Sequence, residues 1–181
     1  MKNNLFRLPL ISLMLLFTAN NLVAQKTVVK KKPVVNAPAT AVIKTFENGI
    51  KLKIKGLTVK EAYLMLEDGT KVPADNMVEL NQKVNLRIVL DKGLKEENGK
   101  VFIGASEKIV LSSGYKVLDS QDLFAAYDET GVSPEDAKYI SLKAVMTELD
   151  DKKKFVKVSF RVWDKRSAAN EITGYYIMHI K

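Results

Sequence analysis

Few side chains in this sequence are of the types that carry out catalysis. The chain has 181 residues, with no cysteine and one histidine, His179. The lack of cysteine excludes disulfides, thiolate zinc sites, iron–sulfur clusters and cysteine nucleophiles. A single histidine excludes a multi-histidine metal site, and no G-x-S-x-G segment supplies a serine nucleophile for His179 to activate. Carboxylates are the catalytic groups that remain, and we expect no cofactor.

Acidic residues gather in the segment 119–136. Two carboxylates that face each other across a cleft can hydrolyse a glycosidic bond, and carboxylates on loops can bind calcium. The segment therefore suggests a carboxylate-based hydrolase or a calcium-dependent carbohydrate-binding module. Its spacing matches no regular calcium loop, and helix capping accounts for several of these acids equally well. The metal ligands of this alternative are Asp119, Asp122, Asp128 and Glu129.

Aromatic, apolar and basic side chains share the predicted outward face of the last two strands. Flat rings beside polar donors suit sugar rings or a protein partner. The predicted binding residues are Arg161, Trp163, Tyr175, Ile177 and His179, with Phe155 beside them. Two other interpretations stay open: another strand or loop covers these side chains, or the faces are reversed, since a one-residue slip exchanges them. His179 alone also fits an ordinary surface histidine.

Lysines alternate with apolar residues in the segment 50–55. Lys51, Lys53 and Lys55 lie on one side of this predicted strand, near Lys44 and Lys60 in the sequence. Such a row suits an anionic polymer, but lysines also keep an exposed strand edge from aggregating. We expect the row to be a solvated strand edge.

Turn dipeptides that contain glycine punctuate the chain from residue 41 onward. Asn and Asp before Gly tolerate the positive φ that tight hairpin turns require. These dipeptides are Asn48-Gly49, Asp68-Gly69, Asn98-Gly99 and Ser113-Gly114. Between these dipeptides and after the last of them, apolar and polar residues alternate, most clearly in 50–55, 84–90, 156–162 and 172–180. A period of two is typical of half-buried antiparallel strands, so we predict a mainly β domain: a single antiparallel β-sandwich, immunoglobulin-like or similar.

The segment 119–149 is less regular. Asp119–Asp122 and Ser133-Pro134 have the residue types that begin helices, which predicts one or two short helices around 120–138. Residues 139–149 fit either a helix or a strand. We favour one helical turn followed by a strand, because 150–153 then forms a hairpin loop into the strand that ends at Trp163.

The first 40 residues differ from the rest of the chain. Residues 1–24 combine a basic start, an apolar run over 8–17 and small residues before Gln25, which is typical of a secretory signal peptide. The apolar run is too short to span a membrane, which takes about 20 residues. Residues 25–40 are rich in Lys, Val, Pro and Ala and predict a flexible leader. The folded domain is then 41–181.

Most of the formal net charge of +8 lies in these first 40 residues. The domain itself is close to neutral, which argues against a nucleic-acid-binding protein. We therefore expect an exported, non-catalytic binding or structural module of the cell envelope, periplasmic or extracellular. Its expected partner is an envelope protein or a glycan, with no nucleic acid and no integral membrane span after signal cleavage.

Overall fold

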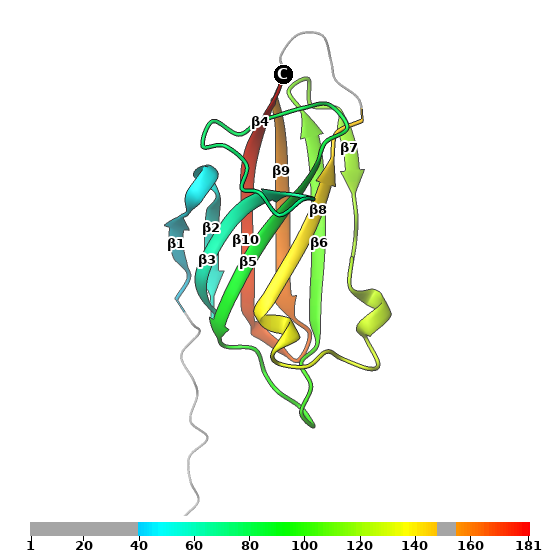
Figure 1. The fold of residues 1–181 in the computed structure, drawn as a ribbon. Helices are drawn as coiled ribbons and strands as arrows, with labels where there is room; N and C mark the ends of the chain where they lie inside the picture. The colour runs from blue at the N-terminus through cyan, green and yellow to red at the C-terminus, as the bar shows by residue number, and fades with distance from the viewer. Residues whose placement is uncertain (1–39, 148–154) are drawn as a thin grey trace, which may run out of the picture. The chain divides into compact units, whose positions relative to one another are not determined.

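A computed structural model of the chain describes residues 40–147 and 155–181. The predicted signal peptide, the leader up to residue 39 and the predicted loop 150–153 lie outside the described residues. The described residues form two antiparallel β-sheets packed face to face (Figure 1). This confirms the predicted mainly β sandwich. No described helix is long and apolar enough to cross a membrane.

The larger sheet has seven strands and the smaller sheet has three. The larger sheet runs in the order β1 (Val42–Thr45), β2 (Lys51–Lys55), β10 (Ser167–Ile180), β9 (Phe155–Asp164), β6 (Ile103–Leu111) and β7 (Lys116–Asp119). The short β4 (Met77–Val78) pairs with the end of β10 in parallel, and the other pairs are antiparallel. The smaller sheet consists of β3 (Thr58–Leu66), β5 (Lys83–Lys92) and β8 (Tyr139–Val145), and Figure 1 shows it in front of the larger one.

The core between the sheets is built from the alternating residues that the sequence singles out. In each long strand the apolar positions point inward and are buried, while the residues between them point outward. The core includes Leu52, Ile54, Leu64, Leu86, Ile88, Leu142, Val158, Val162, Ile172 and Tyr176. Burial of a side chain of this size stabilises a fold by roughly 1.5–3 kcal/mol. The inward row of each strand therefore determines which residues point outward.

The predicted turns all reverse the chain. Asn48-Gly49, in the short 3-10 helix η1 (Glu47–Gly49), joins β1 to β2, and Ser113-Gly114 joins β6 to β7. The other two dipeptides close shorter turns, where Met65 pairs with Lys71 and Glu97 pairs with Lys100. All four turns contain residues with positive φ, which explains the use of Asn and Gly.

The ambiguous segment contains two short 3-10 helices and a strand. They are η2 (Ala125–Tyr127), η3 (Asp136–Lys138) and then β8, so the favoured order of a helical turn followed by a strand is confirmed. The expected hairpin between this strand and β9 is wrong. β8 pairs with β5 in the smaller sheet, whereas β9 pairs with β6 and β10 in the larger one. Alternation shows which side of a strand is buried, but it does not show in which of two packed sheets the strand lies.

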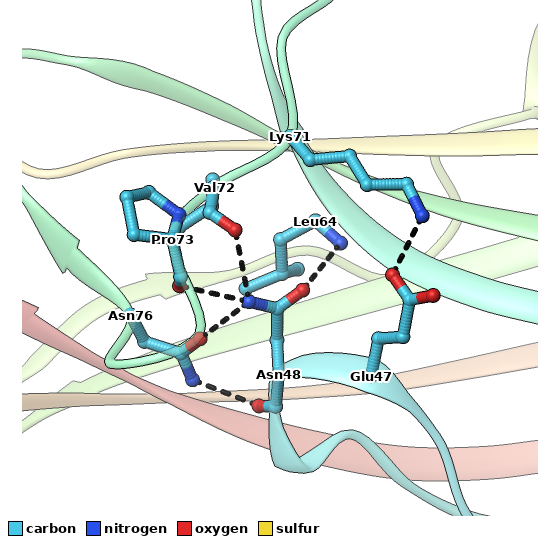
Figure 2. Close-up of polar contacts among 7 residues, drawn as sticks. All are labelled: Glu47, Asn48, Leu64, Lys71, Val72, Pro73 and Asn76. Carbon is cyan, nitrogen blue, oxygen red and sulfur yellow. Dashed lines mark hydrogen bonds and ion pairs between the residues drawn. The ribbon is translucent and has the colours of Figure 1, made fainter.

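Two asparagines tie the sheets together at one end, as Figure 2 shows. Asn48 Nδ2 donates to Val72 O at 3.2 Å and to Asn76 Oδ1 at 2.8 Å, and Asn48 Oδ1 accepts from Leu64 N of β3 at 3.3 Å. Asn76 Nδ2 donates to Asn48 O and to Ile177 O of β10, each at 2.8 Å. We call this network the Asn48–Asn76 clamp. It fixes the β1–β2 turn against one end of β10.

Candidate functional site

The lysine row and the predicted aromatic surface lie on one face. Strands β2, β10, β9 and β6 are neighbours in the larger sheet, and their register places Lys51 opposite Tyr175, Tyr175 opposite Ser159, and Ser159 opposite Lys108. These residues point away from the smaller sheet. We call the surface the outward face of the larger sheet. No described element covers it, and its lysines are half-buried or exposed.

The lysines of β2 do not protect a sheet edge. β2 lies between β1 and β10, so the expected position of Lys51, Lys53 and Lys55 at a strand edge is wrong, whereas Lys51 and Lys53 are exposed to solvent as expected. The nearby lysines separate from this row: Lys44 pairs with inward-pointing Leu52 and so lies on the opposite side of β1, and Lys60 lies in β3 of the smaller sheet.

Most lysines on this face have no acidic partner within 40–147 and 155–181. The carboxylates of the face are each engaged: Glu171 lies 2.6 Å from Arg161 Nη2, and Asp119 lies 2.6 Å from Lys116 Nζ. The lysines of this face that form no ion pair with any described residue are Lys51, Lys53, Lys55, Lys108 and Lys157. Lys108 and Lys55 lie opposite Asp119 and Glu171 in the register, so the uncompensated positive charge of the face is that of the cluster Lys51, Lys53 and Lys157.

Tyr175 lies in the middle of this cluster. The Nζ atoms of Lys157 and Lys51 lie 4.5 Å and 5.8 Å from the centre of its ring. Each such contact is worth about 0.5–1 kcal/mol at an exposed site and holds the ammonium groups beside the ring. A ligand that reaches Tyr175 therefore meets an aromatic ring and two positive charges together.

Two shallow grooves flank Tyr175 along β10. The first, which we call the Thr173 groove, has a volume of about 470 Å³ and is also lined by Ile43 and Ser159. The second, the His179 groove, has a volume of about 440 Å³ and is lined by Ile177 and by the Asn48–Asn76 clamp. Lys51 and Tyr175 line both grooves, so the two are adjacent subsites on one surface.

Two of the predicted binding residues lie at the other end of the face. The indole of Trp163 covers Gly104 of β6, where a Cβ would lie 2.1 Å from Trp163 Cε2. The Arg161 guanidinium lies 4.8 Å from the centre of the indole ring and pairs with Glu171. Trp163 lies level with Glu171, four residues from Tyr175 along β10, or about 13 Å at about 3.3 Å per residue. The predicted set is therefore outward, but only Tyr175, Ile177 and His179 line the grooves.

The acidic segment places two of its predicted metal ligands around a lysine. Lys165 Nζ lies 2.6 Å from Asp122 Oδ2 and also contacts Asp128 Oδ1. Asp122 Oδ1 accepts from the amides of Phe124 and Ala105 at 2.9 and 3.2 Å. Burial works to raise the pKa of Asp122, but the Lys165 ammonium and these amides outweigh it and hold the pKa below its ordinary value. An ammonium group thus occupies the position that a bound cation would take.

The other two acidic candidates lie apart from this ion pair. Asp119 ends β7 and pairs with Lys116, which works through a hydrogen bond to lower the pKa of Asp119. Glu129 is exposed. No group of three or more His, Asp and Glu residues within 40–147 and 155–181 is arranged to hold a metal ion. The structure therefore gives no support to the calcium alternative.

One titratable group that the sequence analysis missed lies inside the sandwich. The side chain of Glu107 on β6 is only 2% exposed, and its Oε1 has no hydrogen-bond partner among the described residues. Burial raises the pKa of Glu107 to about 7. Burial and then the charge of Glu107 raise the pKa of Tyr176, whose hydroxyl is also buried and has no hydrogen-bond partner in the described part of the chain. The available signal was a break in alternation, since Glu107 takes an inward position between Ala105 and Ile109.

A smaller cavity of about 150 Å³ lies beside η2 and η3. Its lining is mainly apolar and includes Ile103, Phe124, Tyr127 and Ile140, with Asp136 among the lining residues. It holds none of the unpaired lysines. The unpaired lysines gather around Tyr175 on the outward face of the larger sheet instead.

No protein-family model and no curated protein matches the sequence. Among solved structures, the chain is similar to the C-terminal domain of Wzt, with 11% identity, a TM-score of 0.43, and coverage of 81% of this chain and 82% of that one. It is also similar to chicken MD-1 complexed with lipid IVa, with 8% identity, a TM-score of 0.32, and coverage of 78% and 98%. Similarity this weak says nothing about what the present chain binds.

Proposed function

We propose that this protein is a non-catalytic binding module of the cell envelope that takes an anionic polymer on the outward face of its larger sheet. One observation carries the proposal: the lysines around Tyr175 have no carboxylate partners among the described residues, on a face that no described element covers. The near-neutral charge of the domain as a whole conceals this local excess.

A polymer suits this face better than a small anion does. A single exposed ion pair contributes only about 0–1 kcal/mol, so one charge binds weakly. A surface that groups charges of one sign raises the local concentration of the opposite charge, and a chain that touches several lysines adds their contributions. Lys51 and Lys157 break no existing ion pair with a described residue when they bind.

The described groups of this face support binding rather than reaction. His179 is exposed on it, and the carboxylates of the face, Glu171 and Asp119, are paired with basic side chains. General acid–base catalysis needs a positioned pair with tuned proton affinities. The carboxyl with a raised pKa, Glu107, points to the opposite side of the sheet, into the core.

Export is part of the proposal and rests on the signal-peptide pattern of residues 1–24. We expect the protein in the envelope or outside the cell, with a mature chain that begins at Gln25. N-terminal sequencing of protein from fractionated cells tests this. An intact Met1 on protein recovered from the cytoplasm would contradict it.

A charge-matched pair of variants tests the binding proposal. Binding of polygalacturonate, polyphosphate and neutral dextran to the mature chain is measured by calorimetry at low and moderate salt. We expect the anionic polymers to bind, more weakly as salt rises, and dextran not to bind. Lys51→Gln/Lys157→Gln should lose most of the affinity, whereas Lys83→Gln/Lys143→Gln, with the same change in net charge on the smaller sheet, should keep it. Equal losses in both variants, or no binding of any anionic polymer, would overturn the proposal.

A further inference from the structure

We infer that the anionic polymer is an acidic polysaccharide that lies along β10, with sugar rings in the two grooves on either side of Tyr175. The inference rests on the proposed function and names the ligand class of the same face.

The shape of the site favours an extended ligand. The Thr173 groove and the His179 groove share Lys51 and Tyr175 and follow one another along β10. From Thr173 to His179 the strand advances six residues, or about 20 Å at about 3.3 Å per residue. A compact ligand fills one groove, whereas a chain fills both.

The lining of the Thr173 groove favours a sugar over a simple phosphate polymer. It presents the hydroxyls of Ser159 and Thr173 beside the side chain of Ile43, which is 75% exposed. A sugar ring matches this mixture, since it carries hydroxyls at its edge and C–H groups on its faces. Polyphosphate has no apolar face to place against Ile43.

The His179 groove has the same mixed character. Ile177, 37% exposed, and half-buried Phe155 supply apolar surface, while the exposed His179 supplies a ring nitrogen that donates or accepts. The Asn48–Asn76 clamp forms the end of this groove and keeps its backbone in place. Both subsites therefore suit neighbouring units of one kind of chain.

The group between the grooves favours an acidic sugar over a neutral one. A uronic acid carries its carboxylate on the sugar ring, so one residue brings an apolar face and a negative charge together. Tyr175 offers an aromatic surface, and the ammonium groups of Lys157 and Lys51 lie 4.5 Å and 5.8 Å from its ring centre. A neutral sugar leaves these two charges unmatched.

The smaller sheet contains a similar pair that serves as a control. Lys71 Nζ lies 4.9 Å from the centre of the Tyr63 ring, but it also pairs with Glu47 at 2.7 Å. Its charge is already compensated, as Figure 2 shows. Tyr63→Ala therefore removes a tyrosine of the same kind from a surface where the lysine beside the ring is paired, although Arg87 opposite Tyr63 forms no ion pair with a described residue.

The experiment compares probes that share charge but differ in shape. Oligogalacturonates of increasing length, polyphosphate and anionic phospholipid vesicles are titrated against the mature chain and against Tyr175→Ala, His179→Ala and Tyr63→Ala. We expect affinity to rise with oligogalacturonate length until both grooves are filled and then to level off. Tyr175→Ala should weaken oligogalacturonate binding tenfold or more and polyphosphate binding less than twofold. His179→Ala should weaken only the longer oligomers, and Tyr63→Ala should change nothing.

The outcomes separate this inference from the proposed function. If polyphosphate or vesicles bind as tightly as the oligosaccharides and Tyr175→Ala leaves all of them unchanged, the ligand class is wrong but the anionic binding face stands. If no anionic probe binds, both are wrong. Melting curves of Tyr175→Ala and Tyr63→Ala show whether both variants stay folded. If Tyr175→Ala does not fold, Lys157→Gln provides the second test.

Discussion

The two outward faces of the sandwich carry similar residues but use their lysines differently. On the smaller sheet, Lys83 and Lys143 lie 3.0 Å and 3.4 Å from Glu67, and their contacts hold the pKa of Glu67 below its ordinary value. On the larger sheet, Lys51 and Lys157 both approach Tyr175 and have no carboxylate partner among the described residues. The smaller sheet therefore pairs Lys83 and Lys143 with a carboxylate, although its Arg87 forms no ion pair with a described residue, whereas the larger sheet groups its unpaired lysines around Tyr175.

This difference indicates that the stability of the fold does not explain why lysines are grouped on the outward face of the larger sheet. Like charges on neighbouring strand positions are weakly destabilising, so the fold gains nothing from grouping lysines there. The other usual reason, protection of a sheet edge, does not apply to β2, which is flanked on both sides. Solvation of an exposed face accounts for lysines as such, and a ligand of opposite charge is the reason that we propose for grouping them around Tyr175. The predictions below test that contrast.

The largest expected effect comes from charge reversal on the larger sheet. Lys51→Glu/Lys53→Glu/Lys157→Glu should weaken binding of polygalacturonate by about 100-fold or more, because each lost contact contributes about 0–1 kcal/mol and each new carboxylate repels the ligand. Calorimetric titration measures this. A loss of less than fivefold would place the ligand elsewhere on the molecule.

The next effect concerns the core behind the same face. The folded-state pKa of Glu107 is about 7, above its ordinary value of 4.5, so the folded protein holds this proton more tightly than the unfolded chain does. Below pH 4.5 the group is protonated in both states and costs nothing. As pH rises from 4.5 to 7, stability falls, and above pH 7 the full loss of about 3 kcal/mol is present, at about 1.4 kcal/mol per pKa unit.

The variant Glu107→Gln measures the loss of stability that comes from ionising Glu107, because its side chain does not ionise. The difference in unfolding free energy between the variant and the parent should grow between pH 4.5 and 7, in favour of the variant, while binding on the outward face stays unchanged. Urea unfolding at a series of pH values measures it. A difference that does not vary with pH would show that Glu107 keeps its ordinary proton affinity.

A smaller effect should separate the two ends of the outward face. Gly104→Ala places a methyl group where the Trp163 indole lies, so the ring must move, and we expect a loss of about 1–3 kcal/mol in stability. Oligogalacturonate affinity should change less than twofold, because Trp163 lies about 13 Å along the sheet from Tyr175. Thermal unfolding and titration measure the two quantities. A large loss of affinity would extend the binding site to Trp163.

The smallest effect should come from unpairing lysines on the smaller sheet. Glu67→Gln frees Lys83 and Lys143. The hollow of about 310 Å³ beside Glu67 and Lys83 has no aromatic residue in its lining, so we expect anionic polymers to bind less than threefold more tightly. The ion pairs are exposed, so stability should fall by less than about 1 kcal/mol. If the variant bound as tightly through the smaller sheet as the parent does through the larger one, charge alone would explain recognition and the grooves would be irrelevant.

The sequence predicts the strands better than it predicts their neighbours. Alternation correctly places Lys51 and Tyr175 on outward faces, because the inward side of each strand must be apolar. It does not show that they lie opposite each other, since pairing between β2 and β10 joins distant parts of the chain. For the same reason, alternation predicts a wrong hairpin between β8 and β9 and does not show that the lysine row and the aromatic residues share one face. Glu107 was detectable as a charged residue in an apolar row.

Lysine footprinting tests the central claim most directly. Mature protein is acetylated with and without a long oligogalacturonate, and mass spectrometry gives the ratio of the two rates at each lysine. We expect protection of Lys51, Lys53 and Lys157 and unchanged rates at Lys71, Lys83 and Lys143. Uniform protection across both sheets, or protection centred on the smaller sheet, would contradict it.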